Sequence, residues 1–246
     1  MSNIIDFKIQ GKNRLCNVQL HCKDNLELKN LKLDPFDIVI CDGPYGIVPP
    51  NDLDVAGFAC EWDDFILNSK KDAKRFRAYY RTLFDVCLPH LKKSASIFIC
   101  GFPEGTNIIK GLLDEEYDLN FRRSISWVYE NHYDFDQGAN FHRSHETVLY
   151  YTCTKDFVFH SGGVRDVLNH PIALRELNAV KDGAKPLGFS RFLLDTAFVP
   201  GGRLLSLFAG SGTDLIAATE YDMDAAGFEF NPVHVDIITN RLNKRL

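Results

Sequence analysis

Four consecutive residues, Asp42-Gly43-Pro44-Tyr45, could together hold an amino group for reaction. They follow the apolar run 38–41, which is typical of a buried strand. The carboxylate of Asp42 and the backbone carbonyl of Gly43 are two acceptors that could orient one –NH2 group toward an electrophile. The ring of Tyr45 offers a face on which a planar base can stack. A tight turn explains the same residues, because Pro44 fixes its φ angle and Asp42 can cap the turn.

A run of small residues, AGSG at 209–212, forms a second candidate site after the apolar segment 203–208. Small residues let the backbone approach a ligand closely, and the N–H groups at the start of the next helix favour a polar or anionic moiety. Glu229 comes sixteen residues after Thr213, at the expected end of the following strand, where a carboxylate can accept both hydroxyls of a ribose. The arrangement indicates a nucleoside cofactor; an ordinary turn followed by a solvated glutamate is the alternative.

The spacing of the glycines argues against two common nucleotide-binding motifs. Position 215 is a leucine, where the GxGxxG pattern of dinucleotide-binding proteins needs its third glycine. The GK[ST] signature of the P-loop is also missing, because Thr213 follows Gly212 directly. A triphosphate is therefore disfavoured, and a nucleoside with a small zwitterionic tail fits better.

Both candidate sites need a scaffold that brings separate strand ends together. Hydrophobic periodicity predicts strands at 17–22, 36–41, 94–102, 124–131, 146–153, 203–208 and 225–230. It predicts helices at 24–31, 70–91, 104–115, 186–197, 213–221 and 232–245. The alternation of strands and helices in the last third requires a parallel sheet with right-handed crossovers. We therefore expect an α/β fold with a doubly wound, mostly parallel sheet, whose ligands lie beyond the carboxyl ends of the strands.

Composition limits the classes of protein to which the chain can belong. Its 246 residues are 45% hydrophobic and 25% charged, which suits one globular α/β domain. The net charge of −5 means that binding to nucleic acid would require a local basic face. We expect no membrane span and no signal peptide. The seven cysteines include no CxxC pair and indicate reduced thiols in a cytoplasmic protein, and His142 and His145 lack the partners of a metal site.

In its ordered motifs the chain resembles the S-adenosylmethionine-dependent DNA amino-methyltransferases, the N6-adenine/N4-cytosine family, in the subgroup whose catalytic motif precedes the cofactor motif. The stretch DIVICDGPYG (37–46) stands where that family has DPPY or SPPY, and SLFAGSGTD (206–214) where it has DPFxGSGTT. The resemblance covers the chain from about residue 15 to the end and includes four further segments: ISWVYEN (125–131), RSHETVLYYTCTKDFVFH (143–160), AKPLGFSRFLLDTAFVPGG (184–202) and GFEFNPVHVDIITNRL (227–242).

This resemblance implies a Rossmann-like class I methyltransferase fold over a single domain, 1–246. It implies transfer of a methyl group from S-adenosylmethionine to the exocyclic N6 of adenine in double-stranded DNA after base flipping, as in restriction–modification systems. An aspartate at position 42, rather than serine, favours adenine over the N4 of cytosine. The catalytic residues would be Asp42, Gly43, Pro44 and Tyr45. The cofactor would contact Lys185, Pro186, Ser206, Phe208, Ala209, Gly210, Ser211, Gly212, Thr213, Glu229, Phe230 and Asn231.

Two departures from the family pattern keep other functions open. Gly43 replaces the first proline of the tetrapeptide, so the carbonyl is kept and rigidity is lost. Ser206-Leu207 replaces the usual Asp-Pro, which removes a carboxylate near the cofactor. The alternatives are methylation of N4 of cytosine, methylation of RNA, and a catalytically degenerate protein that only binds.

Contacts with DNA require a local cluster of positive charge. The densest cluster lies in the predicted helix after residue 69, and an ordinary solvated helix face is the alternative explanation. Segment 46–68 would be a lid or a DNA-contacting loop, and 161–183 a short target-recognition insert. A homodimer is a further expectation from the family. The candidate DNA-binding residues are Lys70, Lys71, Lys74, Arg75, Arg77, Arg81, Arg122 and Arg143.

Overall fold

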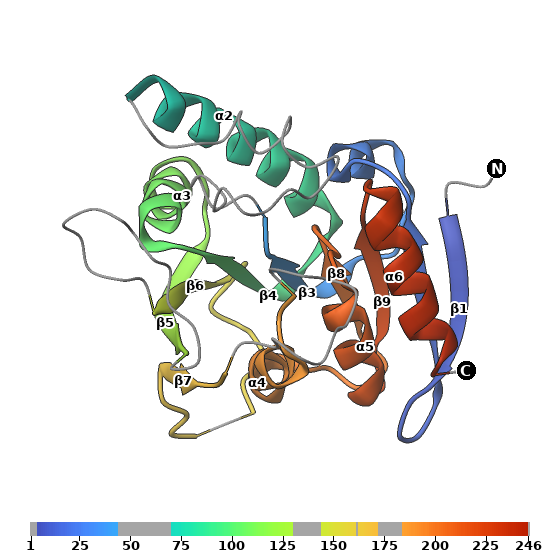
Figure 1. Ribbon diagram of the computed structural model, residues 1–246. Coiled ribbons are helices and arrows are strands. Elements are labelled where there is room, and N and C mark those ends of the chain that lie inside the picture. Colours follow the sequence, from blue (N-terminus) through green and yellow to red (C-terminus); the bar gives the residue numbers. More distant parts are fainter. Residues whose placement is uncertain (1–3, 44–69, 130–143, 161, 172–183, 246) are drawn as a thin grey trace.

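A nine-stranded mixed sheet forms the centre of the computed structural model (Figure 1). The structure describes residues 4–43, 70–129, 144–160, 162–171 and 184–245. The predicted loop 46–68 and most of the predicted insert 161–183 lie outside these ranges. In spatial order the strands are β1 (Ile4–Gln10), β2 (Leu15–His21), β9 (Asp224–Phe228), β8 (Arg203–Ser206), β3 (Phe36–Cys41), β4 (Leu91–Gly101), β6 (His145–Thr152), β5 (Asn120–Val128) and β7 (Val167–Asn169).

Five neighbouring strands, from β2 through β9, β8 and β3 to β4, run parallel to one another. Strand β1 pairs antiparallel with β2 at one end, and β6 pairs antiparallel with both β4 and β5 at the other. The expectation of a doubly wound, mostly parallel α/β sheet is therefore confirmed for the central strands. Strands β1 and β7, which extend the two edges, are additions to the strands that the sequence pattern predicts.

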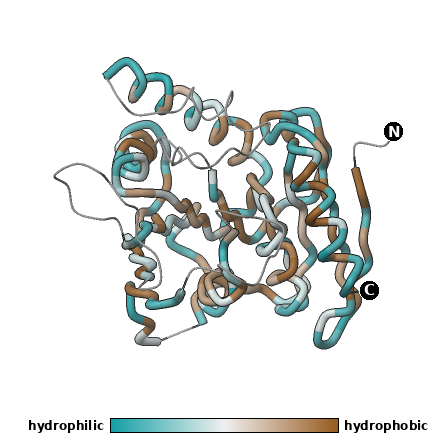
Figure 2. The backbone as a smooth tube through the Cα atoms, in the orientation of Figure 1, coloured by the Kyte–Doolittle hydropathy of each residue, from teal (hydrophilic) through white to brown (hydrophobic). Residues whose placement is uncertain are grey.

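Helices cover both faces of the sheet (Figure 1). Residues of α4 (Leu187–Ala197), α5 (Thr213–Glu220) and α6 (Pro232–Asn243) share one core cluster with one face. Residues of η1 (Asn25–Asn30), α2 (Lys70–Cys87) and α3 (Pro103–Glu116) share a second cluster with the other face. Strand β3 is buried at every position because it lies between these two layers, which explains its apolar run at 38–41; its one charged residue, Asp37, pairs with Lys92. Hydrophobic segments accordingly concentrate along the central strands (Figure 2).

Two predicted helices differ from the observed ones. The segment predicted as a helix at 24–31 forms the short 3-10 helix η1, which Asp24 caps by accepting from the backbone N–H of Leu26. The helix predicted to reach residue 91 ends at Cys87, where the 3-10 turn η3 (Leu88–His90) begins. Pro89 lies in that turn and has no N–H to continue an α-helix. Within the described residues no helix combines the length and hydrophobicity needed to span a membrane.

The parallel strands β3 and β8 are hydrogen-bonded neighbours, and the order in which the chain adds strands to the sheet reverses between them. From β3 the chain continues to β4 on one side, and from β8 it continues to β9 on the other. The connection that follows β3 and the connection that follows β8 therefore run toward opposite edges of the sheet. They diverge at the carboxyl ends of the two strands. Ligands of doubly wound sheets bind in this position. Asp42 follows β3, and the glycine-rich turn (207–212) follows β8, so the two candidate sites meet there.

Candidate active site

The end of β3 is packed so tightly that a side chain at Gly43 would have to displace its neighbours. A Cβ atom at Gly43 would lie 2.5 Å from Cε2 of Phe208 and 2.8 Å from the hydroxyl oxygen of Tyr80. Both rings belong to the wall of the site, since Phe208 lies in the glycine-rich turn and Tyr80 is fully buried in α2. Glycine at position 43 is therefore suited to this protein, because Phe208 and Tyr80 occupy the space that a larger residue would need. The predicted catalytic residues Pro44 and Tyr45 lie outside the described residues.

Lys185 joins the end of β3 to strand β6. Its ammonium nitrogen lies 3.0 Å from Oδ1 of Asp42 and 3.1 Å from Oε2 of Glu146. The side chains of Lys185 and Glu146 are each only 9% exposed, so little water screens these ion pairs. Burial opposes the charge on Lys185, but the two carboxylates outweigh it and raise the pKa of the lysine above its ordinary value. The ion pair therefore holds Asp42 in one orientation at the strand end.

A buried aspartate in the first turn of α5 supplies a third carboxylate. Asp214 is 7% exposed, and its two oxygens accept from different hydroxyls: Oδ1 from Ser190 at 2.6 Å and Oδ2 from Ser206 at 3.2 Å. Burial is the main cause that raises the pKa of Asp214 to about 6, and the charge of Asp42 raises it further. The two serine hydroxyls and Lys185 act in the opposite direction. Asp214 is thus held by two hydroxyl groups, and its pKa lies well above that of an ordinary aspartate.

The turn between β8 and α5 depends on its glycines. Gly210 has φ +52° and Gly212 has φ +77°, a region that side chains rarely adopt. A Cβ at Gly210 would meet nothing within 4 Å, so open space lies beside this part of the turn. Arg241 of α6 donates from one guanidinium nitrogen to the backbone oxygen of Ser211 and to the hydroxyl of Thr213. Arg241 of α6 therefore anchors the turn, and the open space at Gly210 leaves room for a ligand.

Glu229 follows β9 and faces the glycine-rich turn. Its Oε2 accepts from the N–H of Gly210 and its Oε1 from the N–H of Asn231, both at 2.9 Å. The residue is 8% exposed, and each carboxylate oxygen can accept a further hydrogen bond. The next residue, Phe230, is 51% exposed and offers an aromatic surface beside the carboxylate. Asn231 caps α6 by accepting from Val233.

Together these features fit a nucleoside cofactor. The open space at Gly210 admits a ligand, the fixed carboxylate of Glu229 suits a diol, and the exposed ring of Phe230 suits a planar base. The structure brings most predicted cofactor residues to one place, since they belong to the glycine-rich turn, the end of β9 and the segment before α4. Lys185 belongs to this group too, although its ammonium group pairs with the carboxylates of Asp42 and Glu146.

Two functional candidates are missing from the residues that the sequence predicts. Glu146 lies in the segment RSHETVLYY, whose resemblance to the family assigns the glutamate no role. Asp214 ends the segment SLFAGSGTD, in which Ser206-Leu207 replaces the usual Asp-Pro. The structure shows that Ser206 is bonded to Asp214, so a carboxylate is present at the end of β8 after all.

The predicted DNA-binding residues fall into three groups. Lys70, Lys71 and Lys74 are exposed at the start of α2. Arg77 and Arg81 form ion pairs with glutamates of α3: Arg77 with Glu115 and Glu116, and Arg81 with Glu116. Arg122 lies 4.2 Å above the ring of Phe157, near the start of β5 and away from the carboxyl edge, and Arg143 is outside the described residues. Arg75 lies beside Lys74 and is also exposed.

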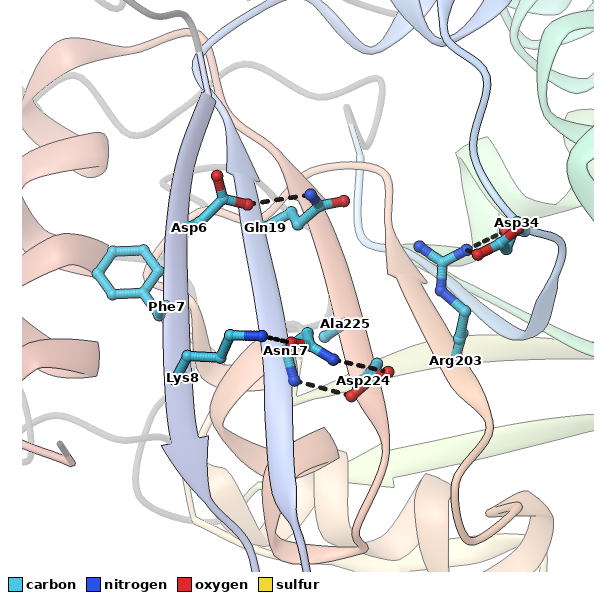
Figure 3. Close-up of a pocket in the computed structure, with 9 residues that line it drawn as sticks. All are labelled: Asp6, Phe7, Lys8, Asn17, Gln19, Asp34, Arg203, Asp224 and Ala225. Atoms are coloured by element: carbon cyan, nitrogen blue, oxygen red, sulfur yellow. Dashed lines mark hydrogen bonds and ion pairs between the residues drawn. The ribbon is translucent and has the colours of Figure 1, made fainter.

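A polar pocket of about 320 Å³ lies elsewhere, over the starts of β8 and β9 (Figure 3). Its polar side chains already pair within the lining, as Asp6 does with Gln19, Asn17 with Asp224 and Arg203 with Asp34. The starts of these parallel strands are opposite the carboxyl ends at which Asp42 and Glu229 lie. The pocket is therefore separate from the candidate active site.

Two solved structures share the fold of this chain. The structure is similar to M1.HpyAVI in its complex with SAM, with a TM-score of 0.64, 17% identity, and coverage of 92% of this chain and 99% of that chain. It is similar to the PvuII DNA methyltransferase, which is cytosine-N4-specific, with a TM-score of 0.70, 12% identity, and coverage of 96% and 95%. At these identities the similarity establishes the fold, that of the class I methyltransferases.

The sequence itself adds the more specific result. No curated protein matches the chain. The family model N6_N4_Mtase, described as DNA methylase, matches residues 36–183, which is more than half of the chain. That range begins at β3 and includes Asp42 and Glu146, two of the carboxylates that meet above the sheet. The chain therefore belongs to the DNA methylase family whose members modify N6 of adenine or N4 of cytosine.

Proposed function

We propose that the protein transfers a methyl group from S-adenosylmethionine to the N6 amino group of adenine in DNA. The observation that carries this proposal is the position of Asp42, which Lys185 fixes at the end of β3 beside the glycine-rich turn. The family supports methylation of an exocyclic amine in DNA, and the SAM complex of M1.HpyAVI supports the identity of the cofactor. The aspartate at the start of the tetrapeptide favours adenine.

Asp42 and Gly43 would hold the target amine. A carboxylate oxygen of Asp42 and the carbonyl oxygen of Gly43 accept its two N–H bonds, so that the nitrogen lone pair faces away from the protein backbone. The ion pair with Lys185 prevents Asp42 from rotating away, which places the amine before the reaction begins. When bound, the cofactor supplies an electrophilic methyl group on a positively charged sulfur. The remaining residues bind, orient and exclude water.

The cofactor would lie between the glycine-rich turn and Phe230. Glu229 would accept the ribose hydroxyls through oxygens that already accept from Gly210 and Asn231, and Phe230 would cover the adenine ring. The target adenine must leave the duplex to reach Asp42, because its amino group takes part in base pairing. The lysines at the start of α2 are the proposed phosphate contacts.

The test is methylation of unmodified duplex DNA with isotopically labelled S-adenosylmethionine, followed by digestion to nucleosides. The proposal expects labelled N6-methyladenine, and no label when Asp42→Ala is used. The matched control is Asp195→Asn, which removes an exposed carboxylate of α4 that bonds Tyr221, and should leave the rate unchanged.

The products distinguish the competing substrates. Label in N4-methylcytosine alone would replace the adenine assignment, a result for which the similarity to the cytosine-N4-specific PvuII enzyme gives a specific reason. A parallel reaction with RNA separates the two nucleic acids. Binding of DNA without any methylation would identify a catalytically degenerate relative.

A further inference from the structure

Among the residues that the structure describes, the candidate active site contains more negative than positive charge. A charge cluster consists of the partly buried Asp42 after β3 and three buried residues, which are Glu146 in β6, Asp214 in α5 and Lys185 before α4. Lys185 pairs with Asp42 and Glu146, whereas Asp214 accepts from the uncharged hydroxyls of Ser190 and Ser206. Within the described part of the chain, one ammonium group thus accompanies three carboxylates. Cys100 also lies among these groups, but burial raises the pKa of its thiol, which stays neutral.

Negative charge without a nearby positive charge costs free energy in a cluster that is shielded from water. Burial removes a carboxylate from water, and a nearby positive charge must replace the lost hydration if the group is to remain ionised. Asp42 and Asp214 repel one another electrostatically, and Lys185 offsets part of this repulsion. Asp214 responds by keeping its proton to higher pH than an ordinary aspartate does. The site consequently favours a ligand that brings in positive charge.

Asp214 is held in a position from which it can attract a positively charged ligand. Ser190 in α4 and Ser206 in β8 hold its two oxygens, so the carboxylate cannot turn away from the site toward solvent. Its helix begins directly after Gly212, so the aspartate lies in the first helical turn after the loop that the cofactor is proposed to contact. The charged groups that act on it are Asp42 from β3 and Lys185 from the segment before α4.

We propose that Asp214 makes the site prefer the positively charged methyl donor over the neutral thioether product; this inference rests on the proposed function. During transfer a nitrogen–carbon bond forms and the carbon–sulfur bond breaks, with its electron pair remaining on sulfur. The amine loses one proton to water. The donor therefore loses its sulfonium charge when it becomes product, and with that charge it loses the attraction of Asp214, which favours product release.

The inference predicts a linkage between donor binding and pH. Binding of the donor favours the ionised form of Asp214, so a proton is released when the donor binds below the pH at which Asp214 titrates in the free protein. Donor affinity should therefore rise about tenfold between about pH 5 and about pH 8. Affinity for the product should change much less over the same range, because the product lacks the sulfonium charge.

Calorimetric titration of the full chain with S-adenosylmethionine and with S-adenosylhomocysteine tests the inference. The Asp214→Asn variant should lose about tenfold in donor affinity at about pH 8, keep its product affinity, and show a flat pH profile for the donor. Asp195→Asn is the matched control and should behave as the unmodified protein. An equal loss of donor and product affinity in Asp214→Asn would overturn the inference and assign Asp214 a structural role.

A second variant keeps the test valid if Asp214→Asn folds poorly. Ser190→Ala removes one of the two hydroxyls that stabilise the ionised Asp214, so the midpoint of the donor pH profile should move to higher pH. An unmoved midpoint would contradict the inference. Failure of the unmodified protein to bind S-adenosylmethionine at any pH would overturn the proposed function as well, whereas binding without preference for the donor overturns the inference alone.

Discussion

Gly43 and Phe208 are in direct contact across the junction between β3 and the glycine-rich turn. A Cβ at Gly43 would lie 2.5 Å from Cε2 of Phe208, although related tetrapeptides have proline at this place. Restoring the family residue should therefore damage this protein. We expect Gly43→Ala and Gly43→Pro to lower the free energy of unfolding by about 1–3 kcal/mol and to reduce methylation. Denaturant unfolding and the nucleoside assay measure the two effects.

The matched control for Gly43→Ala is Gly162→Ala, where the added Cβ meets nothing within 4 Å. It should leave stability nearly unchanged. The double variant Gly43→Ala with Phe208→Leu should recover part of the lost stability, because the smaller side chain makes room. No recovery would show that the glycine is needed for a reason other than the ring of Phe208.

Lys185 should be more important to stability than an exposed lysine with a similar ion pair. Lys185→Met removes the cation that pairs with the partly buried carboxylate of Asp42 and the buried carboxylate of Glu146, which should cost about 3–5 kcal/mol of unfolding free energy. Lys110→Met removes the partly exposed pair with Asp114 and should cost at most about 1 kcal/mol. Chemical denaturation of both variants compares them, and equal costs would contradict the buried ion-pair assignment.

His21 should make the fold sensitive to mild acid. Neither ring nitrogen has a hydrogen-bond partner within the described part of the chain, and the ring stacks on Phe228 with centroids 4.7 Å apart. Burial is the main cause that lowers the pKa of His21 below its ordinary value of 6.5. The unfolded chain therefore binds a proton that the folded protein rejects, so stability falls as pH falls below about 6.5.

The comparison between the protein and His21→Phe isolates this contribution. Phenylalanine keeps the stacking on Phe228 and cannot take up a proton, so the free energy of unfolding should depend less on pH between about 7 and 5. Asp214 acts in the opposite direction, because its raised pKa adds stability as pH falls through about 6. The free energy of unfolding is therefore measured against pH for both the unmodified protein and His21→Phe. The difference between the two curves isolates the effect of His21, because the contribution of Asp214 is common to both.

Glu229 should determine affinity for the cofactor. Glu229→Gln keeps one acceptor oxygen and loses the charge that strengthens hydrogen bonds to the ribose, so the dissociation constant for S-adenosylmethionine should rise about tenfold. Glu220→Gln is the control, since that glutamate pairs with Arg191 and Arg245 at the end of α5. Unchanged affinity in Glu229→Gln, measured by calorimetry, would remove Glu229 from the cofactor site.

The basic residues of α2 should separate into two functional groups. Lys71→Gln with Lys74→Gln should weaken DNA binding and reduce the slope of log affinity against log salt by about 0.9 for each phosphate that the protein no longer neutralises. Arg77→Gln should chiefly lower stability, because its guanidinium joins α2 to two glutamates of α3. Lys8→Gln, in the polar pocket of Figure 3, is the control for a lysine remote from the site. A salt slope unchanged by the lysine variants would place the DNA elsewhere.

The sequence is sufficient to predict the central strands and the main candidate residues. Asp42, Gly210 and Glu229 each follow an apolar strand, and residues that end parallel strands are brought together by the fold itself. The partners of these residues cannot be predicted in the same way. The pairing of Lys185 with Glu146, and of Asp214 with Ser190, joins elements whose relative positions depend on tertiary packing.

The edges of the sheet are harder to predict than its centre. Strand β7 has three residues, too few for a recognisable period. Strand β1 does alternate, with Phe7 and Ile9 buried between exposed neighbours, so its sequence carries a strand signal that the prediction missed. The catalytic roles of Pro44 and Tyr45, the recognition segments 46–68 and 161–183, and the homodimer stay predictions.

The pairing of β3 with β8 has a consequence for synthesis on the ribosome. Ile38 is opposite Leu204, so the most buried strand of the protein gains its second neighbour only when the last fifth of the chain emerges. At ordinary translation speeds this delay is on the order of ten seconds, during which one edge of β3 is exposed. A chaperone that binds extended apolar segments would have its natural target in the nascent chain at residues 36–41.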